Sequence, residues 1–329
     1  AGKPMQVELP QAPRDGITSA VFANESNLLM VTSWDATTRI YDVDANEMIH
    51  RFEQGTGILD SSFSLDDTKA FAGGIDGKLR MMDFKEANSA VLGSHSKGIK
   101  CVEYCDATGL VITGGWDEMI KVWDPRSKDA LSGTYDLKGR IFSMSLSGYR
   151  TVVATSGRHV KIFDIRKMDT PEQDRLSSLQ HQLRVVRCFP DSKGYAVGSC
   201  EGRVAIEYFD VSPEIQKMKY AFKCHRKTGA DGKQILYPVN ALAFHPTYGT
   251  FASGGCDGVV NVWDGYAKKR VCQYPTYQTS ISYLCYNKDG SRLAVAQSYT
   301  FEEGERDHPR DAVYIRHVTE QECKNKPRK

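Results

Sequence analysis

The chain has almost no net charge and no long apolar segment. Its 43 Lys and Arg residues face 41 Asp and Glu residues, a formal net charge of +2 over 329 residues. No segment approaches the roughly 18 consecutive apolar residues that a membrane-spanning helix needs, and no apolar segment resembling a signal peptide opens the chain. A near-neutral protein has no overall field that draws it to membranes or nucleic acid. We therefore expect no membrane contact and no strong nucleic-acid binding, so that any preference for charged ligands comes from local clusters.

A disulfide framework is missing as well. The nine cysteines are scattered, odd in number and mostly placed within apolar strand patterns. Such a distribution favours reduced thiols in the cytosol or nucleus. Cys101 and Cys105 have a weakly zinc-like spacing, but two further ligands are missing nearby, so buried thiols are the favoured interpretation. We expect neither a metal nor a cofactor.

One short pattern returns along the chain at a nearly fixed interval. It reads SWDATTRIYD at 33–42, GIDGKLRMMD at 74–83 and GWDEMIKVWD at 115–124, so that the closing aspartates follow one another every 41 residues. A period of roughly 40–45 residues that ends on an aromatic-Asp pair is typical of the WD-repeat propeller, in which each repeat supplies four strands.

Four less regular units complete the series. They contain VKIFD at 160–164, EGRVAIEY at 201–208, GCDGVVNVWD at 255–264 and AVYIR at 312–316. We predict an all-β, seven-bladed propeller that occupies residues 1–323 as one domain, followed by a disordered basic tail at 324–329. Residues around Gln6 to Leu9 have no blade of their own. They are expected to pair with the seventh blade and to close the ring, which hides a sheet edge.

Two sets of residues imitate a catalytic triad. They are His95, Thr113, Asp117 and Trp123 in one unit, and His225, Ser253, Asp257 and Trp263 in another. A single active site does not need two copies, and neither set has an oxyanion device or a nucleophile elbow beside it. Buried histidines need partners for both ring nitrogens, which these polar side chains can supply. We interpret both sets as structural networks and expect no catalytic residues.

The turns between the second and third strands of the blades open on one face of the ring. Trp34 and Trp116 occupy this turn in two units, where Ile75 and Cys256 stand in others. Ordinary turn packing is one explanation for the tryptophans. The other is an aromatic platform for a partner, because tryptophan is a frequent anchor in protein interfaces.

Basic residues gather in the fifth and sixth units. Arg203 is expected on the same face as the tryptophans, and the flanking segments carry Arg184, Arg187, Lys223 and Arg226. A one-sided basic cluster in a near-neutral protein suggests an acidic or phosphorylated ligand. A solvated charged loop is the alternative.

Several segments resemble two related families of WD-repeat proteins. Residues 201–208, 219–226 (KYAFKCHR) and 237–240 (YPVN) are similar to both the mitotic-checkpoint proteins of the Bub (budding uninhibited by benzimidazole) family and the messenger-RNA export factors of the nuclear pore. Residues 33–35, 255–264 and 308–316 (HPRDAVYIR) favour the checkpoint family. The resemblance extends from about residue 15 to residue 319.

The resemblance implies a non-catalytic adaptor that acts at kinetochores in the mitotic nucleus, as a monomer within a heteromeric complex. Members of the family bind a short motif of checkpoint kinases and kinase-like proteins, and they read phosphorylated Met-Glu-Leu-Thr repeats on a kinetochore scaffold. Trp34, Trp116 and Arg203 match positions that contact the kinase motif. Lys223 matches a position of phosphothreonine reading, and Arg184 and Arg226 are added because they lie nearby in the sequence.

The alternative is an adaptor of messenger-RNA export at the nuclear pore. Binding of RNA would need a broad basic surface with stacking aromatic side chains. The net charge of +2 argues against a strong form of this function.

Overall fold

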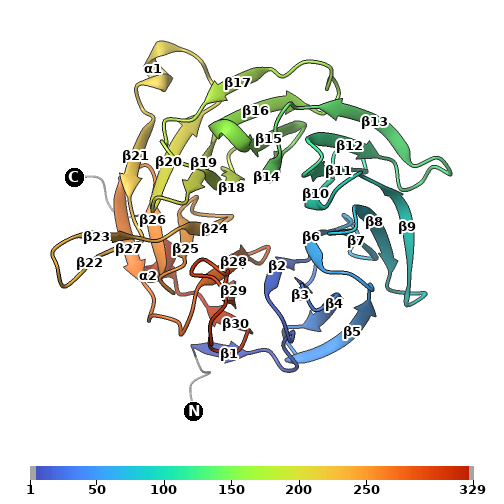
Figure 1. Cartoon of the computed structure of the whole chain (residues 1–329), viewed down its shortest axis with the longest axis horizontal. Coiled ribbons are helices and arrows are strands. Elements are labelled where there is room, and N and C mark those ends of the chain that lie inside the picture. The colour runs from blue at the N-terminus through green and yellow to red at the C-terminus, as the bar shows by residue number, and fades with distance from the viewer. Residues whose placement is uncertain (1–4, 326–329) are drawn as a thin grey trace.

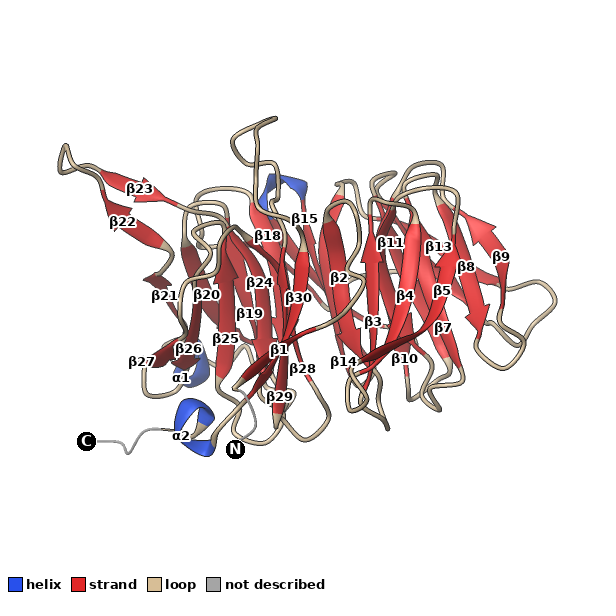
Figure 2. Cartoon of the chain, turned by 90° about the horizontal axis from the view of Figure 1, so that it is seen from below, coloured by secondary structure: helices blue, strands red, loops and turns tan. Residues whose placement is uncertain are grey.

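Seven four-stranded antiparallel sheets surround a central axis (Figure 1). The computed structural model describes residues 5–325. Within a blade the chain runs outward from the axis, so that neighbouring strands in the sheet follow one another in sequence. The strands stand roughly upright between the two faces of the ring when it is seen from the side (Figure 2). The seven-bladed propeller predicted from the repeat is thereby confirmed.

The blades follow the predicted units. The strands of blades 1 to 3 are β2 (Ile17–Phe22), β3 (Leu28–Ser33), β4 (Thr37–Asp42), β5 (Glu47–Glu53), β6 (Ile58–Phe63), β7 (Lys69–Gly74), β8 (Lys78–Asp83), β9 (Asn88–Ser94), β10 (Ile99–Cys105), β11 (Leu110–Gly115), β12 (Met119–Trp123) and β13 (Leu131–Asp136). Those of blades 4 and 5 are β14 (Ile141–Ser147), β15 (Arg150–Thr155), β16 (His159–Asp164), β17 (Gln173–Leu176), β18 (Leu183–Cys188), β19 (Gly194–Ser199), β20 (Arg203–Tyr208) and β21 (Tyr220–Lys223). Those of blades 6 and 7 are β24 (Val239–Phe244), β25 (Phe251–Gly255), β26 (Val260–Asp264), β27 (Lys269–Gln273), β28 (Ile281–Tyr286), β29 (Arg292–Gln297), β30 (Ala312–His317) and β1 (Gln6–Glu8).

A close contact between consecutive blades recurs around the ring. In blades 2, 3, 5 and 6 a glycine of the second strand (Gly73, Gly114, Gly198 and Gly254) packs against the first residue of the next innermost strand. A β-carbon at Gly114 would lie 2.8 Å from Ile141, and one at Gly254 would lie 2.5 Å from Ile281. Both isoleucines are 0% exposed. Blades that bury their apolar faces only against one another depend on such contacts, because a lone blade leaves that surface in water.

Smaller elements lie outside the blades. The hairpin of β22 (Arg226–Thr228) and β23 (Gln234–Leu236) projects from the ring between blades 5 and 6 (Figure 2). Two four-residue helices, α1 (Pro213–Gln216) and α2 (Glu320–Cys323), and the 3-10 helix η1 (Ser156–Arg158) complete the described chain. Over residues 5–325 no helix has both the length and the apolar character needed to cross a membrane. A disordered basic tail was predicted at 324–329, of which residues 326–329 lie outside the described residues. Lys324, at its start, pairs with Glu320 of α2, with 3.0 Å between Nζ and Oε1.

The N-terminal segment provides the outer strand of blade 7. β1 pairs antiparallel with β30, with Val7 opposite Ile315. The backbone N–H of Leu9 donates to the Val313 carbonyl at 2.9 Å, and the Leu9 side chain is 2% exposed. One blade thus joins strands from both ends of the chain. That this strand stabilises the closed ring stays a prediction.

Deleting residues 1–10 should lower the melting temperature markedly, because blade 7 loses its outer strand and the buried Leu9. Differential scanning calorimetry provides the measurement. Deleting only residues 1–4 is the matched control, since it keeps β1. An unchanged melting temperature for the longer deletion would show that β1 does not hold the ring closed.

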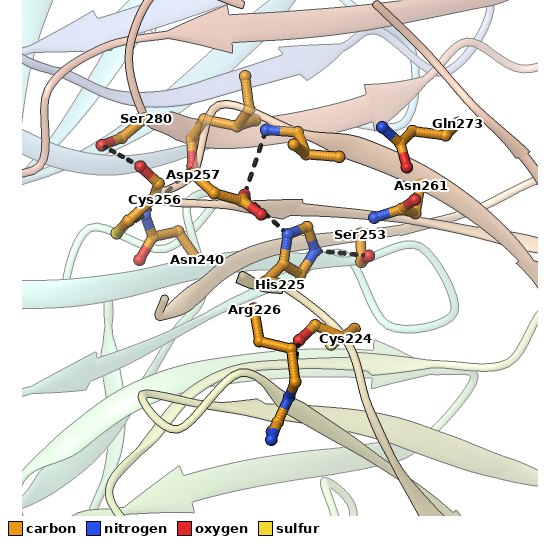
Figure 3. A network of polar contacts seen from close by, with 12 residues as sticks. Cys224, His225, Arg226, Asn240, Ser253, Cys256, Asp257, Asn261, Gln273 and Ser280 are labelled. Atoms are coloured by element: carbon orange, nitrogen blue, oxygen red, sulfur yellow. Dashed lines mark hydrogen bonds and ion pairs between the residues drawn. The ribbon is translucent and has the colours of Figure 1, made fainter. Parts of the chain in front are cut away.

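Two polar networks of the same design connect the turns of blades 3 and 6. His95 Nδ1 lies 2.9 Å from Asp117 Oδ1 and its Nε2 lies 2.7 Å from Thr113 Oγ1, which also accepts from Trp123 Nε1 at 2.8 Å. The second network repeats these contacts at 2.9, 2.8 and 2.8 Å with His225, Asp257, Ser253 and Trp263. Figure 3 shows His225 between Asp257 and Ser253.

Burial keeps the histidine of the His95 network neutral and hydrogen-bonded to its partners. Burial lowers the pKa of His95, although the Asp117 carboxylate acts in the opposite direction. A carboxylate only accepts hydrogen bonds, so Nδ1 carries the hydrogen and the neutral ring accepts at Nε2 from the Thr113 hydroxyl. Thr113 and Ser253 are both 0% exposed, which leaves no path for a substrate to either hydroxyl.

Asp117→Ala and Asp257→Ala should each lower the free energy of unfolding by roughly 1–3 kcal/mol, because a buried ring N–H loses its acceptor. Urea denaturation measures this loss. Asp136→Ala is the control, since its carboxylate forms an exposed pair with Lys138 and such pairs contribute little. A network variant that kept full stability but lost ligand binding would show that the aspartate belongs to a binding site instead.

Candidate functional site

A wide hollow opens at the axis on the turn face, the face that carries the turns between the second and third strands of the blades. Its volume is about 1390 Å³. The second residue of every innermost strand lines it: these are Thr18, Leu59, Lys100, Phe142, Arg184, Asn240 and Ser282. Strand residues alternate between two sides, so equivalent positions in equivalent strands point toward the same space. The ring therefore brings seven residues together that are far apart in the sequence.

Both predicted tryptophans border this hollow. Trp34 follows β3, and its ring lies against Gly57, where a β-carbon would come within 2.8 Å of the indole. Trp116 follows β11 and lies in the same way against Gly98, at 3.0 Å. Trp34 is 43% exposed, whereas Trp116 is half-buried rather than exposed. Each indole is held by a glycine that leaves room for it, and the remainder of the ring is available to a ligand.

Arg184 lies in the hollow and not with the other predicted basic residues. Its Nη2 donates to Asn240 Oδ1 at 2.8 Å, which joins blades 5 and 6 at the inner wall. Lys223 is on the outermost strand of the same blade. Three strand spacings separate inner from outer strand, about 14 Å. The basic residues therefore do not form the single cluster expected from the sequence, because Arg184 and Lys223 lie at opposite edges of blade 5.

Arg203, Lys223 and Arg226 form a separate group at the turn of blade 5. Arg203 lies opposite Lys223 in the pairing of β20 with β21, and its Nε is 3.7 Å from Glu201 Oε2. Arg226 Nη2 donates to the carbonyls of Glu201 and Gly202, each at 3.3 Å. Lys223 is exposed. Arg226 thus supports the turn, while Arg203 and Lys223 present positive charge beside it.

Sequence reasoning missed most of the charge around the hollow. Lys97, Lys100, Arg140 and Arg306 line it together with Arg184, whereas its acidic lining residues are Asp15 and Glu305. A local excess of positive charge in a protein of net charge +2 favours an acidic ligand. The signal for Lys100 was available, because it has the same place in its repeat as Arg184.

Within residues 5–325 no group of three or more His, Cys, Asp or Glu side chains is placed to hold a metal ion. All nine cysteines, which lie between residues 101 and 323, are free thiols. What the turn face offers is a hollow with aromatic anchors and cationic side chains, which suits recognition of a peptide.

Comparisons with known proteins agree with the repeat. The family model "WD domain, G-beta repeat" matches residues 3–42, 87–124 and 222–264. A structure of U3-55K superimposes with a TM-score of 0.82 at 13% identity, covering 95% of this chain and 98% of that one, which is a likeness of fold alone.

Relatives of much higher identity cover nearly the whole chain. The mitotic checkpoint protein BUB3.1 of Arabidopsis thaliana is 52% identical over 98% of this chain and 95% of its own. The mitotic checkpoint protein bub3 of Dictyostelium discoideum is 45% identical over 94% of each chain. The mRNA export factor GLE2 of Chaetomium thermophilum is more distant, at 34% identity over 98% and 92%. The chain therefore belongs to the Bub3 family of WD-repeat mitotic checkpoint proteins.

Proposed function

We propose that this protein is a non-catalytic adaptor of the spindle checkpoint that binds a short motif of checkpoint kinases and kinase-like proteins on its turn face. The observation that carries the proposal is the hollow, in which Trp34 and Trp116 lie beside a lining that has more basic than acidic residues. Aromatic side chains at the edge of a desolvated pocket are frequent anchors of interfaces. The two tryptophans take apolar side chains of the motif.

Arg203 lies outside the hollow, beside the turn of blade 5, and pairs loosely with Glu201. A motif that contacts both places therefore extends from the axis onto blade 5. Arg203 holds acidic groups of that extended part, because its guanidinium can offer two donors to one carboxylate.

The second ligand is a phosphorylated Met-Glu-Leu-Thr repeat of a kinetochore scaffold. Lys223 is exposed next to Arg203 and serves the phosphate as a point charge. Arg226, three residues further on, adds positive charge from a fixed position. Arg184 belongs to the hollow and contributes to the kinase motif rather than to the same phosphate. The protein acts in the nucleus and at mitotic kinetochores, as a monomer within a heteromeric complex.

The alternative is an adaptor of messenger-RNA export at the nuclear pore, supported by the 34% identity to GLE2. The two functions differ in their partners and in the phase of the cell cycle. Pull-down from mitotic and interphase extracts, followed by peptide sequencing, separates them. Capture of nuclear-pore proteins in interphase without checkpoint kinases in mitosis would favour the export function.

Trp34→Ala and Arg203→Ala should weaken binding of a synthetic kinase-motif peptide by roughly thirtyfold, since truncating an interface anchor costs about 2 kcal/mol or more. Isothermal titration calorimetry measures the affinities, and melting curves check the fold. Ile75→Ala is the matched control, because Ile75 follows β7 at the equivalent turn of blade 2 and is 37% exposed there. Equal loss in the control would show that the turns respond as a whole and not through these anchors.

Lys223→Ala should weaken binding of a phosphorylated Met-Glu-Leu-Thr peptide more than binding of the unphosphorylated peptide, because the ammonium gains little from a neutral threonine. Calorimetry with both peptides, at saturating kinase motif, measures the difference. Lys233→Ala, at an exposed lysine of the β22–β23 hairpin, is the control. Equal affinity of the parent protein for both peptides would remove phosphate reading from the proposed function, and equal loss in the variant would remove Lys223 from it.

A further inference from the structure

The turn of blade 7 differs from its counterparts. Between the second and third strands, blades 1, 2 and 3 have residues 34–36, 75–77 and 116–118, whereas blade 7 has residues 298–311. This 298–311 loop reaches the mouth of the hollow, which it lines with Tyr299, Thr300, Phe301, Glu305, Arg306 and His308. A long loop in a compact fold is often functional.

Hydrogen bonds hold this loop in one shape. Glu302 accepts from Ser280 Oγ at 2.5 Å and from Thr300 Oγ1 at 2.8 Å, which attaches the loop to the start of blade 7. Tyr299 Oη donates to the Gly304 carbonyl at 2.8 Å and accepts from the Glu303 N–H at 3.0 Å. The loop therefore has its shape before any ligand arrives, which lowers the entropic cost of binding.

Aromatic and charged groups stack within the loop. The Arg306 guanidinium lies 4.9 Å from the ring centroid of Tyr299, and the His308 ring lies 5.0 Å from it. The ends are fixed as well, because Ser298 Oγ donates to Asp311 Oδ1 at 2.6 Å and Arg310 pairs with Glu8 of β1. These contacts fix the backbone around Phe301, whose own side chain is exposed.

Phe301 is 63% exposed and has a φ of 62°. Such a backbone conformation is unusual for a bulky side chain and persists only where the surroundings impose it. The exposed ring borders the same hollow as Trp34 and Trp116. One side of the ring lies against Tyr299, with 6.2 Å between the ring centroids, and the rest faces solvent at the edge of the hollow. Strained backbone conformations of this kind are frequent at ligand clamps.

We propose that the 298–311 loop is a third wall of the motif site, with Phe301 as a further aromatic anchor. It takes an apolar side chain of the same acidic and apolar peptide that the tryptophans bind, and so determines which motifs are accepted. The occupant follows from continuity, since the loop lines one hollow with Trp34, and from charge, since the lining has more basic than acidic residues. This inference rests on the proposed function.

The test compares three variants at one position by calorimetry with the synthetic kinase-motif peptide. Phe301→Ala should weaken binding about tenfold or more, while Phe301→Tyr should keep most of the affinity. Phe301→Gly should weaken binding at least as much as Phe301→Ala without lowering the melting temperature, because glycine adopts a positive φ without strain. Tyr149→Ala is the control, an aromatic residue that is 40% exposed in a turn on the opposite face.

The outcomes separate this inference from the function on which it rests. Unchanged affinity in Phe301→Ala, together with weakened binding in Trp34→Ala, would overturn the role of the loop and leave the proposed function in place. Unchanged affinity in both variants would overturn the proposed function itself. A dimer seen by analytical ultracentrifugation in the parent protein and lost in Phe301→Ala would assign the ring to a second copy of this chain, which also overturns the inference.

Discussion

The closed ring depends on the packing of each innermost strand against the preceding blade. Where the second strand of a blade carries glycine, as at Gly73, Gly114 and Gly254, a β-branched side chain from the next blade fills the space that a side chain would take. The contact is too close for any larger residue without overpacking. It is found in blades 2, 3, 5 and 6, where it lets the next innermost strand approach closely.

The hollow forms only when the seven blades close into a ring. No blade contains it, and its wall consists of single residues from seven innermost strands. Side chains at these positions differ in size and charge from blade to blade. Some of them bond to the adjacent blade: Thr18 Oγ1 donates to the Ile58 carbonyl at 2.6 Å, and Arg184 Nη2 donates to Asn240 Oδ1 at 2.8 Å. A rigid ring lined by variable residues separates stability from recognition, which places the chemistry of the site outside the constraints of the core.

The turns contribute to recognition in two different ways. Short turns after β3 and β11 hold tryptophans against glycines, so the anchors are fixed by the packing of the blades themselves. The 298–311 loop is held by its own hydrogen bonds, by the stacking around Tyr299, and by bonds from Glu302 to Ser280 and from Arg310 to Glu8. Arg187 on β18, which the sequence suggested as part of the basic cluster, does not line the hollow. Its guanidinium donates to Tyr283 Oη at 2.8 Å and to the Met144 carbonyl at 3.3 Å.

The regular parts of the repeat could be predicted from the sequence. Alternating strands and a fixed interval predicted the blades, the seventh-blade strand at 312–316 and the face on which Trp34 and Trp116 lie. The outermost strand of blade 5 was harder to predict. Residues 212–236 are polar and rich in lysine, yet they include β21, the outermost strand of that blade. An outermost strand has one neighbour and much solvent, so its apolar pattern is weak.

The sequence by itself determined the number of blades, the order of their strands and the residue types at each turn, because these follow from local periodicity. Only the tertiary structure decided which residues meet. It placed Arg184 at the axis and Lys223 at the rim of one blade, gathered Lys97, Lys100 and Arg140 around the hollow, and brought Phe301 to its edge. The physical reason is that residues of different blades meet at the axis only when all seven blades close the ring, and no segment of the chain contains that information alone.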